Sequence, residues 1–486
     1  MIIKSDPDII KSFLEDNSGL RGGYVKEVSF PESTEEVSLI LSKANKERVP
    51  VTVAGNGTGV AGGRVPFGGL VLSTERLNKN IEIKRLDDKN GKAKVHAGAM
   101  LKDLKEAAKK EGLLYPPDPT EDTAYIGGNV ATNASGARGF KYGPTRRYIS
   151  GLKVVLADGT ILDIKRGESF AKERLLNLKE KTSIKLPSYT MPSVKNAAGY
   201  YIHDNLDAVD LFIGQEGTLG IISEIELDLI HESGDILSFF AFFDSDKNAR
   251  NFASALKRNL KEALSVEYFD INSLALLKDK FPYIPDAEAA LFFEKEKSKD
   301  DIDATLEEIS GSLKKNGAFY DQTLFAQNEN EYKKLFDLRH GLPERVNEIV
   351  KANGFPKVGT DIAVPEEGLD SMLSLYKTTL ERSGIPYVIF GHIAECHLHV
   401  NTLPSSEKEY NHAKEIYIKF VEAAVKLGGT VSAEHGIGKL KHKYLEKMYG
   451  PKAIREMASL KKAFDPNCIL GVGNIFPKEL LNKAGD

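Results

Sequence analysis

The chain has 486 residues, too many for one ordinary hydrophobic core, so we expect two or three domains. Hydrophobic residues make up 41% and charged residues 28%, which is the balance of a folded protein and excludes a disordered one. The 66 basic and 70 acidic residues give a formal net charge of −4. No nucleic-acid partner is expected, because proteins that bind nucleic acids usually carry a basic surface.

Two cysteines, Cys396 and Cys468, are too few for a four-cysteine iron–sulfur cluster or a disulfide framework. The N-terminus lacks the basic and apolar regions of a secretory signal. The strongest apolar run, Ile236–Phe243, is far too short to span a membrane and is typical of a buried strand. We therefore predict a soluble, cytoplasmic protein without a transmembrane segment, and leave peripheral contact with a membrane open.

The first 230 residues predict short strands mixed with helices. A helix is expected just after Ser33, because this residue can cap it and apolar residues then recur at helical spacing. A second helix is expected at 101–111, and the pair Asp158-Gly159 predicts a hairpin turn. Strands are expected at 49–53, 70–73, 81–85, 94–97, 152–156, 161–164, 211–213 and 221–229.

The pattern changes near residue 230, where we place a domain boundary. A long helix is expected at 246–263, and helices are prominent beyond it. The last fifty residues are again helical and end in a glycine-containing segment. Strands are expected at 236–243, 265–270, 289–294 and 388–390.

Four segments are rich in glycine and small polar residues. Glycine permits positive φ and lets backbone N–H groups approach a ligand closely, so such turns can form a nest for a diphosphate. Each segment alone is a weak signal, because tight turns use the same residues, and the first lacks the Walker and Rossmann spacings. The segments are 53–63, 116–136, 214–225 and 470–476.

In this order and spacing the segments resemble the vanillyl-alcohol-oxidase type of FAD-binding fold, and more closely its branch that contains the FAD-linked D-lactate dehydrogenases and the D-type subunits of glycolate oxidase. The resemblance covers nearly the whole chain. It implies an α+β fold with a two-part FAD-binding domain at 1–230 and an α+β cap (substrate) domain with an antiparallel sheet at 231–430. A C-terminal helical segment at 431–486 would complete the active site and pack back on the FAD-binding domain.

In that family the first segment wraps the diphosphate of FAD, the second runs toward the flavin, and the third binds near the adenosine and ribitol parts. Some relatives attach FAD covalently through a histidine in the first segment. This chain has Asn56 and Thr58 there, so non-covalent FAD is expected. The FAD-binding residues that the resemblance implies are Gly55, Asn56, Gly57, Thr58, Gly59, Gly128, Thr132, Ser135, Gly136, Glu216, Gly217 and Ile222.

Histidines gather in the C-terminal half of the chain. His392, His397 and His399 lie within one short segment, and Glu434 and His435 precede a glycine turn in another. In an extended segment two residues that are two apart share one face, as His397 and His399 would. Three histidines and a carboxylate suit zinc, manganese or ferrous iron. Buried structural histidines are the alternative, but clustering beside glycines favours a metal site.

The resemblance assigns roles within these segments. His392, His399 and Glu434 match the ligands of a divalent metal, and His435 matches the catalytic base. Asn401 would lie beside the substrate. Arg339 matches the arginine that binds the substrate carboxylate, a role that suits a planar guanidinium with paired donors; the alternative for Arg339 is a surface charge on a helix.

Two departures from the family matter. Many relatives have Gly-Asp-Gly-Asn where this chain has Ala394-Glu-Cys-His, so His397 either adds a metal ligand or lines the substrate pocket. Some relatives that act on dicarboxylic acids have a lysine where this chain has Gly359. That difference favours D-lactate or glycolate over D-2-hydroxyglutarate.

The predicted function is FAD-dependent, metal-assisted oxidation of a small D-2-hydroxy acid, first of all D-lactate, to the 2-oxo acid. Hydride would pass to flavin N5, and electrons would go on to a separate acceptor such as an electron-transfer flavoprotein, a quinone or a cytochrome. Three alternatives stay open: a catalytic subunit of a larger electron-transfer complex, a non-redox flavoenzyme like alkyl-dihydroxyacetonephosphate synthase, and a nucleotide-binding module without catalysis. Homodimer formation is also left open.

Overall fold

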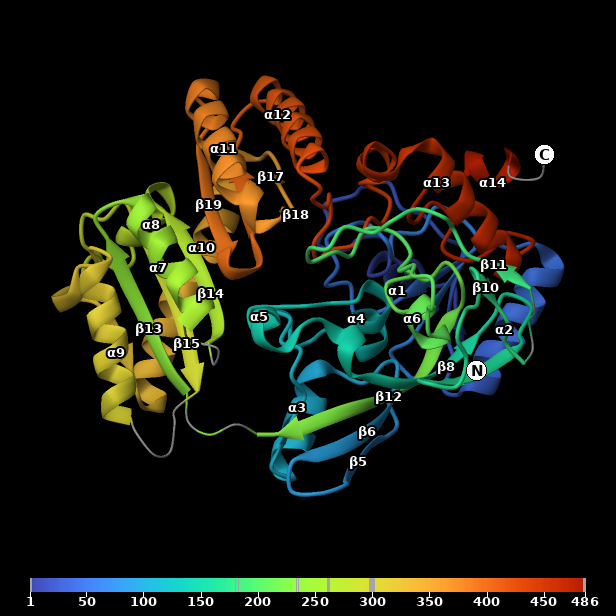
Figure 1. Cartoon of the computed structure of the whole chain (residues 1–486). Coiled ribbons are helices and arrows are strands. Elements are labelled where there is room, and N and C mark those ends of the chain that lie inside the picture. The colour runs from blue at the N-terminus through green and yellow to red at the C-terminus, as the bar shows by residue number, and fades with distance from the viewer. Residues whose placement is uncertain are drawn as a thin grey trace.

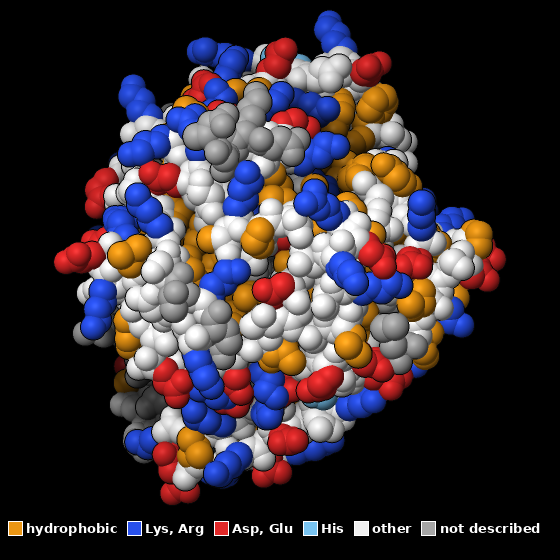
Figure 2. All heavy atoms as spheres, turned by 90° about the vertical axis from the view of Figure 1, so that its right-hand side faces the viewer, with side chains coloured by type: hydrophobic (Ala, Val, Ile, Leu, Met, Phe, Trp, Pro, Cys, Tyr) orange, Lys and Arg blue, Asp and Glu red, His pale blue; other side chains and the backbone are white. Residues whose placement is uncertain are grey.

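The computed structural model contains three main sheets with helices packed around them (Figure 1). Two of the sheets and the C-terminal helices form one side of the molecule in this view, and the third sheet with its helices forms the other. Basic and acidic side chains are interspersed over the face in Figure 2, as the small net charge leads one to expect. The structure describes residues 2–179, 181, 183–232, 234, 236–259, 263–296 and 302–483, without the side chains of 259, 482 and 483.

The first sheet has four strands in the order β1-β2-β4-β3, of which β2, β3 and β4 are parallel. The helix predicted after Ser33 is confirmed, and the Ser33 hydroxyl accepts a hydrogen bond from the backbone N–H of Glu36. Its apolar face packs against this sheet through Val37 and Leu41. The elements are β1 (Ile2–Lys4), α1 (Pro7–Lys11), β2 (Glu27–Phe30), α2 (Thr34–Glu47), β3 (Val51–Ala54) and β4 (Leu70–Ser73).

The second sheet is antiparallel and has the order β5-β6-β12-β8-β9, with β7 paired to β12. Its strands and helices are β5 (Ile81–Arg85), β6 (Asn90–His96), α3 (Leu101–Lys110), β7 (Leu113–Leu114), α4 (Ile126–Thr132), α5 (Gly139–Tyr142), β8 (Ile149–Val155), β9 (Ile161–Lys165), α6 (Ala208–Phe212) and β12 (Ile221–His231). A small hairpin of β10 (Leu175–Leu176) and β11 (Ile184–Lys185) lies apart from it.

One local expectation was wrong in this region. The strand expected at 211–213 is the end of helix α6, whose first turn is capped by the Asp207 carboxylate. A short apolar run fits a buried helix as well as a strand, so periodicity could not separate them. Part of the glycine-rich segment at 116–136 is also helical, as α4. Gly127 lets this helix lie close to the residue that follows β6, since a Cβ there would lie 2.6 Å from that of Ala97.

The third sheet is antiparallel, with the order β16-β13-β15-β14-β19-β20-β17 and with β18 paired to β20. β12 ends in the second sheet and β13 begins in the third, close to the predicted domain boundary. The elements are β13 (Ile236–Phe243), α7 (Asp246–Asn259), β14 (Ala263–Asp270), α8 (Ile271–Lys278), β15 (Ala289–Glu296), α9 (Ile302–Lys315), β16 (Leu324–Ala326), α10 (Glu329–Asn353), β17 (Val358–Gly359), β18 (Ile362–Ala363), α11 (Leu369–Ser383), β19 (Tyr387–His392), β20 (His397–Thr402) and α12 (Glu407–Lys426).

The C-terminal segment returns to the first half of the chain, where α13 (His442–Phe464) and α14 (Glu479–Lys483) lie in Figure 1. Phe464 packs edge-on against Phe212, and the buried Lys461 donates a hydrogen bond to the carbonyl of Thr218. Residues 431–441 run between the third sheet and the first two, since the N–H of Ala433 donates to the carbonyl of Asp361 and the N–H of Lys439 donates to that of Ala61. No helix in the described part of the chain is both long and apolar enough to cross a membrane.

Candidate cofactor cavity and active site

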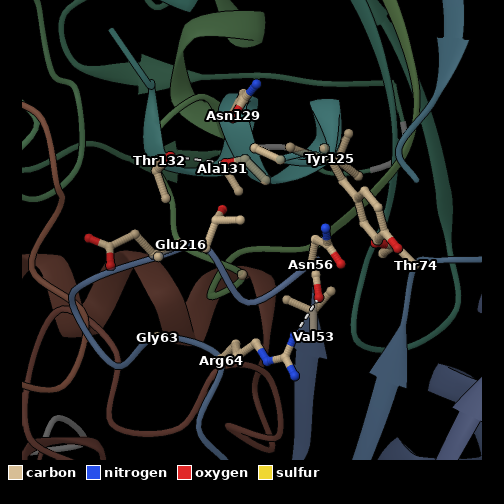
Figure 3. Close-up of a pocket in the computed structure, with 18 of the residues that line it drawn as sticks. Val53, Asn56, Gly63, Arg64, Thr74, Tyr125, Asn129, Ala131, Thr132 and Glu216 are labelled. Carbon is tan, nitrogen blue, oxygen red and sulfur yellow. Dashed lines mark hydrogen bonds between the residues drawn. The ribbon is translucent and has the colours of Figure 1, made fainter. Parts of the chain in front are cut away.

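A deep cavity opens where the loop after β3 faces α4 and the loop before β12 (Figure 3). Its empty volume, with the part open to solvent, is about 990 Å³. Most of the predicted FAD-binding residues line it: Gly55, Asn56, Gly57, Thr58, Gly59, Gly128, Thr132, Glu216, Gly217 and Ile222. Residues that are far apart in the chain and that the resemblance implies for FAD thus line a single cavity.

Backbone geometry explains the glycines in these two loops. Gly57 and Gly217 have φ values of +81° and +73°, which side-chain-bearing residues rarely adopt. A Cβ on Gly217 would also lie 2.5 Å from Cγ1 of Val53. The third glycine segment can thus pass directly over the end of β3, and the two loops form one continuous wall.

Several lining residues were not predicted. The Asn474 amide donates hydrogen bonds to the carbonyls of Gly63 (3.0 Å) and Glu216 (2.9 Å), so it joins the first and third glycine segments. The Arg64 guanidinium donates to the carbonyl of Gly55 at 2.8 Å (Figure 3). Asn474 belongs to the fourth glycine segment, and that segment could have identified it as a lining residue. Nothing in the sequence pattern singled out Arg64.

Glu216 connects this cavity to the C-terminal segment. Its carboxylate accepts hydrogen bonds from the backbone N–H groups of Ile437 (2.8 Å) and Gly438 (2.6 Å). Burial raises the pKa of Glu216 to about 7 against the lowering effect of these two bonds. A residue that lines the cofactor cavity therefore also fixes the turn that follows His435.

The Glu216→Ala variant should unfold at a melting temperature about 5 °C or more below that of the parent, because two buried N–H groups lose their acceptor. It should also release FAD more readily on gel filtration. Glu106→Ala is the matched control, since Glu106 is exposed on α3. Equal melting temperatures for the two variants would contradict this role of Glu216.

A second cavity adjoins the first. The two share Thr58, Gly59, Ala124, Asn129 and Thr132 in their walls. The remaining predicted FAD-binding residues, Ser135 and Gly136, line only the second of the two. Its opposite wall carries predicted active-site residues, namely Arg339, His392, His399, Glu434 and His435. The structure thus brings the glycine segments and the histidine segments together around connected cavities.

The histidine cluster brings together four side chains that could hold a metal ion. One ligand atom each from His392, His397, His399 and Glu434 lies within 4.8 Å of all the others. Burial lowers the pKa of all three histidines, so their rings are neutral and have a lone pair to donate. His392 Nδ1 and both ring nitrogens of His397 are buried without a hydrogen bond. Buried ring nitrogens without a hydrogen-bond partner are suited to bind a divalent metal.

Lys195 was not predicted and reaches this cluster from the segment between β11 and α6. Its Nζ lies 2.5 Å from Oε1 of Glu434 and 2.8 Å from Oε2 of Glu395. Burial alone would raise the pKa of Glu434, but the Lys195 ammonium holds it well below its usual range. Glu434 is therefore an ionised carboxylate.

His435 lies in the second cavity and is positioned by Asp361, which lies just before β18. The buried Asp361 carboxylate accepts hydrogen bonds from the backbone N–H groups of Glu434 (3.1 Å) and His435 (3.0 Å), and lies 3.4 Å from Nδ1 of His435. Burial lowers the pKa of His435 although Asp361 opposes this, so the ring is neutral near pH 7. A neutral imidazole can accept a proton.

Arg339 is not a free surface charge, because its side chain is only 15% exposed. Nε and Nη2 each donate to the Glu267 carboxylate, at 2.8 and 2.6 Å, and Nη1 lies 3.3 Å from Nε2 of His340. The end-on edge of the guanidinium, formed by Nη1 and the second N–H of Nη2, is the part that can still donate hydrogen bonds to another carboxylate. Asn401, in contrast, is absent from the described lining of this cavity and packs against Gly359. Its placement beside the substrate stays a prediction.

Comparisons with known proteins match two family models to this chain. Residues 25–165 match the family model described as "FAD binding domain", and residues 235–475 match "FAD linked oxidases, C-terminal domain". Glycolate oxidase subunit GlcD of Bacillus subtilis (strain 168) is 31% identical over 92% of this chain and 88% of its own length. A D-lactate dehydrogenase of Anaerostipes hadrus is 30% identical over 96% of this chain and 93% of its own.

Among solved structures, alkyldihydroxyacetonephosphate synthase superposes with a TM-score of 0.67 and 18% identity, over 96% of this chain and 81% of that one. This likeness concerns the fold alone, and it confirms the predicted α+β fold of vanillyl-alcohol-oxidase type. The fold and the cofactor cavity define an FAD-linked oxidoreductase. More specifically, the chain belongs to the family of FAD-linked D-lactate dehydrogenases and GlcD-type glycolate oxidase subunits.

Proposed function

We propose that this enzyme catalyses metal-assisted oxidation of a small D-2-hydroxy acid, with D-lactate as the first candidate, to the 2-oxo acid. One observation carries the proposal: His392, His399, Glu434 and His435 line a cavity that shares a wall with the FAD cavity. We also propose that the FAD-binding domain ends at residue 230 and the cap domain at residue 430. A separate acceptor would take the electrons from the reduced enzyme.

FAD, when bound, supplies the acceptor for the hydride that leaves C2 of the substrate. A divalent metal held by His392, His399 and Glu434 supplies a Lewis acid that lowers the pKa of the substrate hydroxyl. These ligand types suit zinc, manganese or ferrous iron.

The protein side chains would bind the substrate and move the proton. His435 accepts the proton of the 2-hydroxyl group, and Asp361 holds its backbone in place for this task. Arg339 binds the substrate carboxylate through its end-on edge, while Glu267 fixes the orientation of the guanidinium. The hydroxyl proton and the C2 hydride together account for the two hydrogens that a 2-hydroxy acid loses.

The rest of the cavity wall favours a substrate with a neutral side chain. Val60, Phe269, Pro343 and Phe390 supply apolar surface there. Arg339 is the one lysine or arginine among the described lining residues, and it is already paired with Glu267. A second carboxylate on the substrate would therefore find no free cation, and burying an unpaired charge is costly.

Anaerobic flavin bleaching with a panel of D- and L-2-hydroxy acids tests this proposal. D-lactate should reduce the flavin with a kcat/KM at least about tenfold above that of D-2-hydroxyglutarate, because the distal carboxylate of the latter lacks a partner. Bleaching by no 2-hydroxy acid would refute the proposed function. A preference for D-2-hydroxyglutarate would refute the choice of a monocarboxylate only.

A further inference from the structure

His397 is the histidine of the cluster that lies deepest in the protein. It begins β20, pairs with His392 across the β19–β20 ladder, and has no solvent-exposed surface. It is absent from the described lining of the substrate cavity, although both His392 and His399 line it. Contact with a substrate, which the sequence left open for His397, therefore has no support in the geometry.

The surroundings of the His397 ring are polar on two sides. On one side, Nε2 lies 3.2 Å from Oδ1 of Asp361. On another, one ring nitrogen lies within 4.8 Å of ligand atoms of His392, His399 and Glu434. Neither ring nitrogen forms a hydrogen bond of normal geometry. A buried polar atom left without a partner costs roughly 1–3 kcal/mol, so a partner is expected for this ring.

We propose that His397 is a fourth protein ligand of the metal, and that the Asp361 carboxylate accepts a hydrogen bond from the ring nitrogen of His397 that does not bind the metal. This inference rests on the metal site of the proposed function. Histidine ligands commonly donate their second ring N–H to a carboxylate, which fixes the ring and makes it a better donor. The 3.2 Å approach of Asp361 to Nε2 fits this arrangement and leaves Nδ1 for the metal.

A purely structural histidine held by Asp361 is the competing explanation. Asp361 already has other partners: its carboxylate accepts from the Ser432 hydroxyl and the Lys441 ammonium, both at 2.7 Å, and from two backbone N–H groups. It does not need His397 to satisfy its oxygens. A structural role would also leave one nitrogen of His397 unpaired among three other potential ligands.

A fourth protein ligand is compatible with a substrate that chelates the metal. An ion that prefers six ligands and has four from the protein keeps two positions open. A 2-hydroxy acid that chelates through its hydroxyl and one carboxylate oxygen needs two.

The test is metal affinity in the full-length flavoprotein, with Zn²⁺ and Co²⁺ as the probes and a chelating dye as competitor. His397→Asn should bind both ions about 10- to 100-fold more weakly than the parent, and should change the visible absorption of bound Co²⁺. His412→Asn is the matched control, because His412 is exposed on α12 and outside the cluster. Affinity and a Co²⁺ spectrum equal to those of the parent in His397→Asn would overturn the inference.

X-ray absorption of the zinc-loaded parent enzyme tests the same point without a variant, so a folding defect in His397→Asn does not affect it. Three imidazole ligands are expected. Two imidazoles would overturn the role of His397 but leave a metal-assisted reaction with His392 and His399. A parent enzyme that binds neither ion would overturn the metal site of the proposed function together with this inference.

Discussion

The His435→Ala variant should oxidise D-2-hydroxy acids about 10²- to 10⁴-fold more slowly than the parent, because the substrate hydroxyl loses its proton acceptor. FAD should stay bound, since His435 is not among the residues that line the cofactor cavity. Anaerobic stopped-flow measurement of flavin reduction isolates this step from later electron transfer. Loss of rate with an unchanged flavin spectrum would support His435 as the base.

His412→Ala is the control for this variant, because it removes an exposed imidazole from α12. It should reduce the flavin at the rate of the parent. Flavin reduction in His435→Ala within a factor of about two of the parent would mean that another group accepts the proton.

Removal of divalent metal should lower turnover by about 100-fold or more, because Lewis-acid activation is worth several kcal/mol and each 1.4 kcal/mol is about tenfold in rate. The flavin absorbance should not change, since His392, His399 and Glu434 are absent from the lining of the FAD cavity. Dialysis against a chelator, followed by assay and a visible spectrum, measures both quantities on one sample.

Restoring Zn²⁺, Mn²⁺ or Fe²⁺ separately should recover activity with at least one ion and identify the metal. Glu434→Gln provides an independent check, because it keeps the size of the side chain but removes the charged ligand. The variant should resemble the metal-free parent and respond poorly to added metal. Full activity in metal-free parent enzyme would exclude a metal from the reaction.

The sequence by itself determined the parts of this protein that depend on local chain geometry. Ser33 caps α2 as expected, because a cap and its apolar spacing are contained within a few residues. The glycines of the first and third segments line the cavity for a similar reason: positive φ at Gly57 and Gly217 is a local requirement that few other residues meet. His397 and His399 both lie on strand β20, and in such an extended segment a spacing of two residues places them on one face, as expected.

Only the tertiary structure decided which groups act together. Asp361 is far from His435 in the chain, Lys195 is far from Glu434, and Glu267 is far from Arg339, yet each pair is in contact. No periodicity or motif encodes such contacts, because each joins two elements that are distant in the chain and meet only through tertiary packing. The sequence predicted a metal site at the histidines but left the role of His397 open. The burial of His397 and its two ring nitrogens without a hydrogen bond support its place among the ligands. Only packing determines which polar atoms lack a partner, so the sequence could not reveal this.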